Sequence, residues 1–139
     1  MITWCFASLG IYSKKLSEKE IEYILGAEPS RRTEKGDKVI VRGEVMRLRE
    51  ESVWTLDSPL DHSESVESHL EHLLGFAEAK AGKLRSLAAE CDFAIYVSFI
   101  TGDHQGGFTL DEQMLKRLAE LNIRLEVSSF GNRDEQEEN

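Results

Sequence analysis

The sequence has little cysteine and little proline, and no long apolar run. Among its 139 residues are two cysteines and two prolines. Cys5 and Cys91 lack the C-x-x-C spacing of zinc and redox motifs, so we expect two reduced, buried thiols and no metal-binding or disulfide-stabilised scaffold. No apolar run reaches the roughly 18 residues that a membrane helix needs. The first residues also have no basic region, and no small-residue cleavage site follows them, so no signal peptide is predicted and we expect a cytoplasmic protein.

Basic residues are missing from one long segment. From Glu50 to Glu78 the chain has eight acidic residues and no lysine or arginine, whereas residues 31–49 have seven basic and three acidic residues. Opposite charges would stabilise a helix here, so the missing bases leave a repulsion that a basic partner protein could relieve. The net charge of −9 disfavours binding to nucleic acid or to anionic membranes. The candidate partner-binding residues are Glu50, Glu51, Asp57, Asp61, Glu64, Glu67, Glu71 and Glu78.

A simpler interpretation of this acidic segment stays open. Helices tolerate glutamate on a solvated face, and Glu64 and Glu67 near a helix start are favoured by the helix dipole. That interpretation explains about half of the acidic residues and leaves the absence of compensating bases unexplained.

Motifs for catalysis are also missing. Residues 102–107 form a glycine-rich loop between a predicted strand and a predicted helix, but no P-loop lysine follows it and its spacing is not G-x-G-x-x-G. This favours a binding protein over an enzyme and predicts no catalytic residue and no cofactor. The alternative is a small-anion site where this loop meets residues 28–37. Its candidate ligand-binding residues are Arg31, Arg32, Lys35, Gly106 and Gly107.

Three histidines lie close together in the sequence. His69 and His72 are three residues apart on a predicted helix, and His62 precedes them. This spacing suits a metal ion, but a third ligand has no definite position, so we predict solvated side chains and no metal site.

Apolar periodicity divides residues 1–130 into strands and helices. Ser17 and Glu20 form a capping box for a helix over residues 18–25 that ends at Gly26, and Asp111 caps another helix. Residues 28–37 have no period and predict a loop. Residues 2–12 and 92–101 are apolar on both sides, which predicts strands covered on both faces. The other predicted elements are strands at 38–42, at 45–49 continuing through 53–56, and at 123–130, and one long helix at 66–90 with a kink near Gly75.

The resulting order is strand, helix, strand, strand, helix, strand, helix, strand. It predicts an α/β (α+β) fold with a five-stranded mixed sheet, partly ferredoxin-like in its first six elements. Each helix has one apolar stripe, so we expect the helices to pack on the sheet. Residues 1–130 should form a single globular domain, followed by an acidic disordered tail at residues 131–139.

Several short segments resemble one known family. They are Leu16-Ser17, Leu25 to Ser30 with Lys35-Gly36-Asp37, Ser52-Val53-Trp54, and Gly106 to Leu110. Together they resemble the bacterial family catalogued as domain of unknown function 4279, over the stretch from Trp4 to Phe130. The resemblance implies a single-domain α/β fold and supplies no catalytic residue.

These observations predict a small acidic protein-binding module. Its most concrete form is an immunity or inhibitor protein that neutralises a basic toxin such as a nuclease. The alternative is a small-anion-binding or enzymatic domain built on residues 28–37 and 102–107. Either function is compatible with a homo-oligomer.

Overall fold

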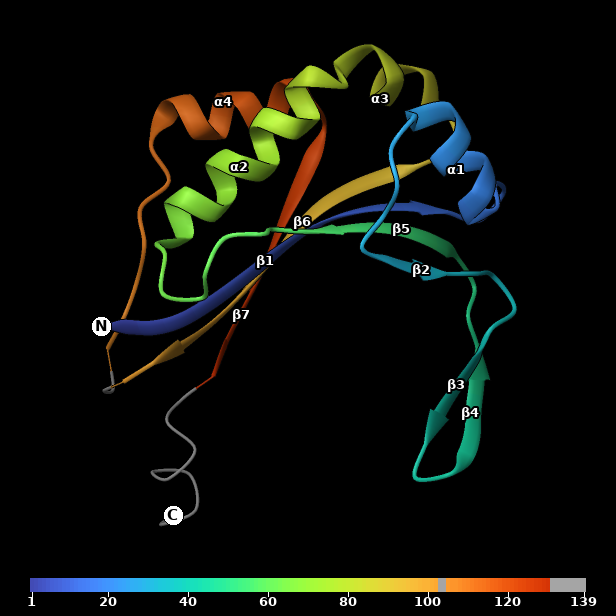
Figure 1. Ribbon diagram of the computed structural model, residues 1–139, viewed down its shortest axis with the longest axis horizontal. Helices are drawn as coiled ribbons and strands as arrows, with labels where there is room; N and C mark the ends of the chain where they lie inside the picture. The colour runs from blue at the N-terminus through green and yellow to red at the C-terminus, as the bar shows by residue number, and fades with distance from the viewer. Residues whose placement is uncertain (103–104, 131–139) are drawn as a thin grey trace.

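A computed structural model describes residues 1–102 and 105–130 and has a mixed α/β fold, as predicted (Figure 1). The acidic tail predicted at residues 131–139 lies outside the described residues. In chain order the elements are β1 (Ile2–Ser13), α1 (Glu18–Leu25), β2 (Arg31–Thr33), β3 (Lys38–Val41), β4 (Glu44–Leu48), β5 (Ser52–Asp57), α2 (Val66–Ala79), α3 (Ala81–Leu87), β6 (Asp92–Thr101), α4 (Glu112–Glu120) and β7 (Ile123–Phe130).

The main sheet has five strands in the order β2-β5-β1-β6-β7. The central strand β1 is antiparallel to both β5 and β6, whereas β6 and β7 are parallel. The parallel pair is joined by α4, because parallel neighbours need a crossover connection. The sheet is therefore mixed, as predicted, and Figure 1 shows all the labelled helices above one of its faces.

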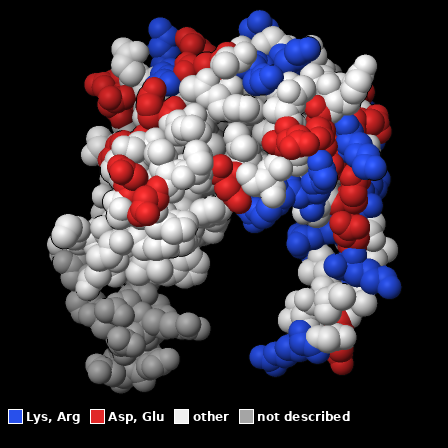
Figure 2. Space-filling view, in the orientation of Figure 1, with Lys and Arg blue, Asp and Glu red and all other residues white. Residues whose placement is uncertain are grey.

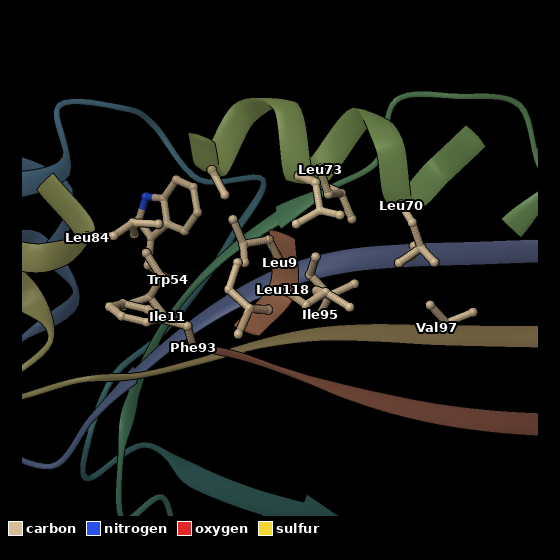
Figure 3. Packing of buried hydrophobic residues seen from close by; sticks show 14 of the residues in the cluster. Leu9, Ile11, Trp54, Leu70, Leu73, Leu84, Phe93, Ile95, Val97 and Leu118 are labelled. Carbon is tan, nitrogen blue, oxygen red and sulfur yellow. The ribbon is translucent and has the colours of Figure 1, made fainter. Parts of the chain in front are cut away.

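The core lies between this helix layer and the sheet. Alternate residues of β1, among them Leu9 and Ile11, point toward the helices and are fully buried. Figure 3 shows Leu73 of α2 above Leu9 and Ile95, the latter from β6. Trp54 of β5 is also fully buried, and its indole N–H donates to the carbonyl of Ala27 at 3.0 Å. The indole thus adds apolar area without leaving a buried donor unsatisfied.

The opposite face of the sheet carries no helix among the described elements, although the two central strands, predicted to be covered on both faces, have buried residues on both. The strands shield this face with their own side chains. The Tyr12 ring lies over Gly10, where an added Cβ would come within 2.8 Å of it. Ser8, Ala94 and Ser98 on the same face are at most 6% exposed. This face is therefore buried at the middle of the two central strands although no described helix covers it.

The hairpin β3–β4 forms a separate two-stranded sheet. The sequence predicted that its second strand continues into residues 53–56, but the chain leaves the hairpin after Leu48 and starts β5 at Ser52. The fifth strand of the main sheet is instead β2, in a segment predicted to be a loop. β2 has three residues paired with Val53 to Thr55 of β5, too few to produce a periodic signal.

The long helix predicted for residues 66–90 is divided into α2 and α3 at Lys80, five residues after the predicted kink at Gly75. The break changes the direction of the chain so that α3 packs against α1. Leu84 and Leu87 of α3 are consequently buried in the core. Within the described ranges, no helix has the length and apolarity needed to cross a membrane.

Candidate protein-binding site

The chain between β5 and α2 is fastened to the first half of β1. The pairing of β5 with β1 ends at Ser8 and Asp57, and the loop that follows β5 lies along the same edge of β1. The backbone N–H of Cys5 donates to the carbonyl of His62 at 2.9 Å, and His62 Nδ1 lies 3.0 Å from the carbonyl oxygen of Cys5. These contacts hold the His62 ring against Trp4, with ring centroids 4.7 Å apart. An aromatic pair thus sits beside the start of α2.

A hollow of about 270 Å³ opens next to this aromatic pair. We call it the acidic pocket, because the described residues that line it include two glutamates and no lysine or arginine. Glu64 is exposed, and Glu67 lies in the first turn of α2, where its Oε1 accepts a hydrogen bond from the Thr109 N–H at 3.1 Å. The pocket is lined by Met1, Ile2, Trp4, His62, Ser63, Glu64, Ser65, Val66, Glu67, Gly107 and Phe108.

Three of the other predicted partner-binding residues are paired with arginines of the same chain. Arg31 of β2 lies 2.8 Å from Asp57. Arg117 of α4 donates to both Glu71 and Glu78, and its hydrogen bond to Glu78 is the main reason that the pKa of this carboxyl is below its usual value. Arg117 comes from a segment far along the chain, so the local sequence could not reveal this compensation.

The remaining three residues occupy different places. Asp61 accepts hydrogen bonds from the backbone and hydroxyl of Ser63, and these lower its pKa. Glu50 and Glu51 lie just before β5 and line hollows that also contain lysine or arginine. The eight acidic residues therefore do not form one continuous surface. Figure 2 shows more acidic than basic side chains over the half that contains α2, and basic side chains with some acidic ones along the hairpin.

The three histidines do not converge on one point, and the prediction that their side chains are solvated is wrong for His69. His69 is 1% exposed, with Nδ1 at 2.7 Å from the Ser58 hydroxyl and Nε2 at 3.1 Å from the carbonyl of Asp61. Because a carbonyl only accepts, Nε2 carries the proton, and burial lowers the pKa of His69. His72 is exposed. No group of three potential ligand side chains suited to a metal ion occurs within residues 1–102 and 105–130.

The two loops of the small-anion alternative lie at opposite ends of β1. Gly106 lies close to Ile2, and Gly107 lines the acidic pocket. Lys35 Nζ instead donates to the carbonyl of Lys14, which lies beyond the other end of β1. Arg32 pairs with Glu18 and Glu22, and Arg31 pairs with Asp57. The structure thus does not bring the five predicted anion-binding residues together. Asp103 and His104 lie outside the described residues.

The sequence reasoning missed the aromatic part of the pocket. Trp4 and Phe108 are separated by most of the chain, and neither was predicted to be a binding residue. The only local signal was that residues 2–12 are mostly apolar. This pattern does not indicate that Trp4, near one end of the strand, is only half-buried. The hydrogen bonds from the Cys5 N–H to the His62 carbonyl and from the Thr109 N–H to the Glu67 side chain bring these rings beside Glu64 and Glu67.

Comparison with known proteins identifies a family but no characterised relative. The family model described as Domain of unknown function (DUF4279) matches residues 3–130. No curated protein and no solved structure matches the chain. The match extends over nearly all the described residues, so it includes the hairpin and the acidic pocket except for Met1 and Ile2.

Proposed function

Because the chain belongs to the family described as Domain of unknown function (DUF4279), whose description names no activity, we propose a function from its site: a protein-binding module that engages a basic protein. Its most concrete form is an immunity or inhibitor protein that neutralises a basic toxin such as a nuclease. The observation that carries this proposal is the acidic pocket, with carboxylates beside aromatic rings and no lysine or arginine among the described residues of its lining.

The chemistry of this pocket suits the side chain of an arginine or lysine. A guanidinium or ammonium group gains from the face of a tryptophan ring and from charge-assisted hydrogen bonds to carboxylates. Trp4 and Glu64 supply these two features from different segments. Aromatic pockets that take an arginine are typical energetic centres of protein interfaces. The pocket would therefore anchor a basic residue of the partner.

The net charge of the chain also favours a basic partner. The chain carries a net charge of −9, and acidic complementarity accelerates the encounter with a basic active-site surface. The proposed binding residues are now Glu64 and Glu67. Glu71 and Glu78 are paired with Arg117, so they would contribute mainly to the long-range field. The small-anion alternative has no comparable supporting observation.

The test is affinity capture with the immobilised chain from extracts of its source cells, followed by affinity measurements with the purified partner. We expect a basic partner whose affinity falls as salt rises, because salt screens the charges. Glu64→Lys should weaken binding about tenfold or more, as placing like charges together in an interface costs several kcal/mol. If the partner is a nuclease, binding should inhibit its cleavage of nucleic acid.

The matched control is Glu51→Lys, since Glu51 belongs to the same acidic segment but lies at the other end of β5. This variant has the same change in net charge and should retain most of the affinity. An affinity that is independent of salt, or equal losses in the two variants, would contradict binding at the acidic pocket.

A further inference from the structure

The hairpin β3–β4 projects from the main sheet, on the side away from the helices (Figure 1). We call residues 36–49 the arm. Four of its apolar side chains, those of Ile40, Val45, Met46 and Leu48, are between 54% and 63% exposed. An isolated two-stranded hairpin is marginally stable in water, and clustered exposed apolar residues mark interaction surfaces. The arm therefore has the composition of an unoccupied interface.

The arm is also basic. From Lys38 to Arg49 it contains four basic residues and one acidic residue. The hollow at its base, of about 660 Å³, is lined by Lys14, Lys35, Arg47 and Arg49, with Glu50 as its acidic member. A surface that covers the arm must therefore be acidic and partly apolar. Nucleic acid fits less well, because it offers no apolar groups to the four exposed side chains and is repelled by the net charge of −9.

An arginine occupies the outermost turn of the arm. Val41 pairs with Glu44, so Arg42 and Gly43 form a two-residue connection. Their φ angles are 52° and 80°, as a type I′ turn requires. Asparagine, aspartate or glycine adopt positive φ most readily, and arginine is uncommon there. The chain thus places an exposed guanidinium group at the tip of the arm, where it can enter a pocket.

The acidic pocket has the matching chemistry. Glu64 and Glu67 can bind the guanidinium group, and the Trp4 ring can stack on the plane of this group. The exposed Met1 side chain can contact the apolar residues of the arm. Within one molecule the two surfaces are far apart. The pocket includes Ile2 at the start of β1, whereas the base of the arm contacts Lys14 beyond its end. The complementary surface is therefore that of a second copy.

We propose that the chain self-associates, with Arg42 of each arm inserted in the acidic pocket of the other copy. The proposal rests on the proposed function in one respect, namely that the pocket takes a cationic side chain. A reciprocal exchange about a two-fold axis uses both surfaces of both copies and closes the assembly as a dimer. A basic partner protein would compete with the arm for the same pocket.

Sedimentation velocity of the full chain over a range of concentrations tests the proposal. We expect a monomer–dimer equilibrium that shifts toward monomer as salt rises. Arg42→Glu should raise the dimer dissociation constant about tenfold or more, because it places a carboxylate against Glu64 and Glu67. Glu64→Arg should have a similar effect from the other side of the interface.

Mixing these two variants provides a test of the geometry. In a mixed dimer, one contact joins an unchanged arm to an unchanged pocket. The other contact joins the two substituted side chains, whose charges are again opposite. Each variant alone should be monomeric, and the mixture should recover dimer. The controls are Arg85→Glu on α3 and Glu90→Arg, which change exposed charges away from the arm and the pocket and should leave the dimer intact. Circular dichroism verifies that every variant is folded.

A wild-type chain that stays monomeric at all concentrations overturns the proposal, as does a dimer that Arg42→Glu does not weaken or a mixture that stays monomeric. These outcomes are distinct from failure of the proposed function. Arg42→Glu leaves the pocket unchanged, so it should bind the captured basic partner at least as tightly as wild type. A wild-type chain that binds the basic partner but does not self-associate overturns only the dimer. A wild-type chain that self-associates but binds no basic partner overturns only the proposed function.

Discussion

Glu18 illustrates how a residue can be buried at an energetic cost. Its side chain is fully buried, and Arg32 Nε lies 3.1 Å from its Oε2 as an ion pair. Neither carboxylate oxygen accepts a well-oriented hydrogen bond from the described residues. Burial therefore raises the pKa of Glu18, against the attraction of Arg32, and the charges of Glu22 and Glu34 add to the rise. Arg32 therefore offsets only part of the cost of burying the Glu18 carboxylate, and the ionised side chain opposes folding.

Replacing Glu18 with glutamine should therefore stabilise the protein near neutral pH. A folded-state pKa above the unfolded value gives stability that is present below the unfolded pKa and is lost as pH rises through the folded pKa. We expect Glu18→Gln to gain stability relative to wild type between about pH 4 and about pH 7, on the order of 1 kcal/mol at the upper end. Urea unfolding at several pH values measures this gain.

The control for this prediction is Glu44→Gln, which removes an exposed carboxylate on the arm. Its difference from wild type should stay small across the same range. A Glu18→Gln variant that is less stable than wild type at neutral pH would mean that the Arg32 ion pair outweighs the cost of burial.

The pH dependence that His69 gives to stability is opposite to that of Glu18. Burial lowers its pKa, so the unfolded chain takes up a proton first as pH falls below about 6.5. The unfolding free energy should fall from that point toward the lower folded pKa. His69→Gln keeps an N–H that can donate to the Asp61 carbonyl but cannot titrate. We expect it to flatten this part of the pH profile, at a cost of about 1 kcal/mol for the lost Ser58 hydrogen bond.

The exposed His72 lies on the same helix and supplies the matched control, His72→Gln. Comparing each variant with wild type in chemical unfolding separates the His69 effect from that of Glu18, which has the opposite slope. Retention of the acid-side fall in His69→Gln would assign it to other groups.

At the scale of the elements, local signals were reliable where one segment contained the whole motif. The capping box of Ser17 and Glu20 and the helix end at Gly26 were predicted, and the structure confirms both, with Gly26 in the left-handed conformation. Asp111 caps α4 as predicted, accepting a hydrogen bond from Met114 N at 2.9 Å. The prediction failed for β2, because its three residues become a strand only through pairing with β5.

The arm and α2 should differ strongly in their contributions to stability. Leu73 of α2 is fully buried, so Leu73→Ala should lower the unfolding free energy by about 2–5 kcal/mol. Met46 of the arm is 63% exposed, and Met46→Ala should change it by less than about 0.5 kcal/mol. Chemical unfolding at high salt, where we expect monomer, makes this comparison.

A large loss in Met46→Ala would show that the arm packs on the body of the molecule. That result would remove the apolar part of the proposed dimer interface. A small loss together with weaker self-association at low salt would fit an arm that is covered only by a second copy.

At the scale of the whole molecule, one region is rich in acidic residues and another in basic residues, and each contains charges of the other sign. The sequence separation of acidic and basic residues persists in the fold, since the arm is basic and the start of α2 is acidic. The fold also neutralises part of each region, through Arg31 with Asp57 and through Arg117 with Glu71 and Glu78. What remains for a partner is smaller and more localised than the sequence predicted. Both proposals depend on this remainder.

The sequence by itself determined the periodic elements, the helix caps and the net charge, because each depends on residues that are near in the chain or on composition alone. The tertiary structure decided which strands share a sheet, which carboxylates meet an arginine and where Trp4 lies beside Glu64. These features depend on contacts between distant segments. Their free energy is gained only when the core brings those segments together.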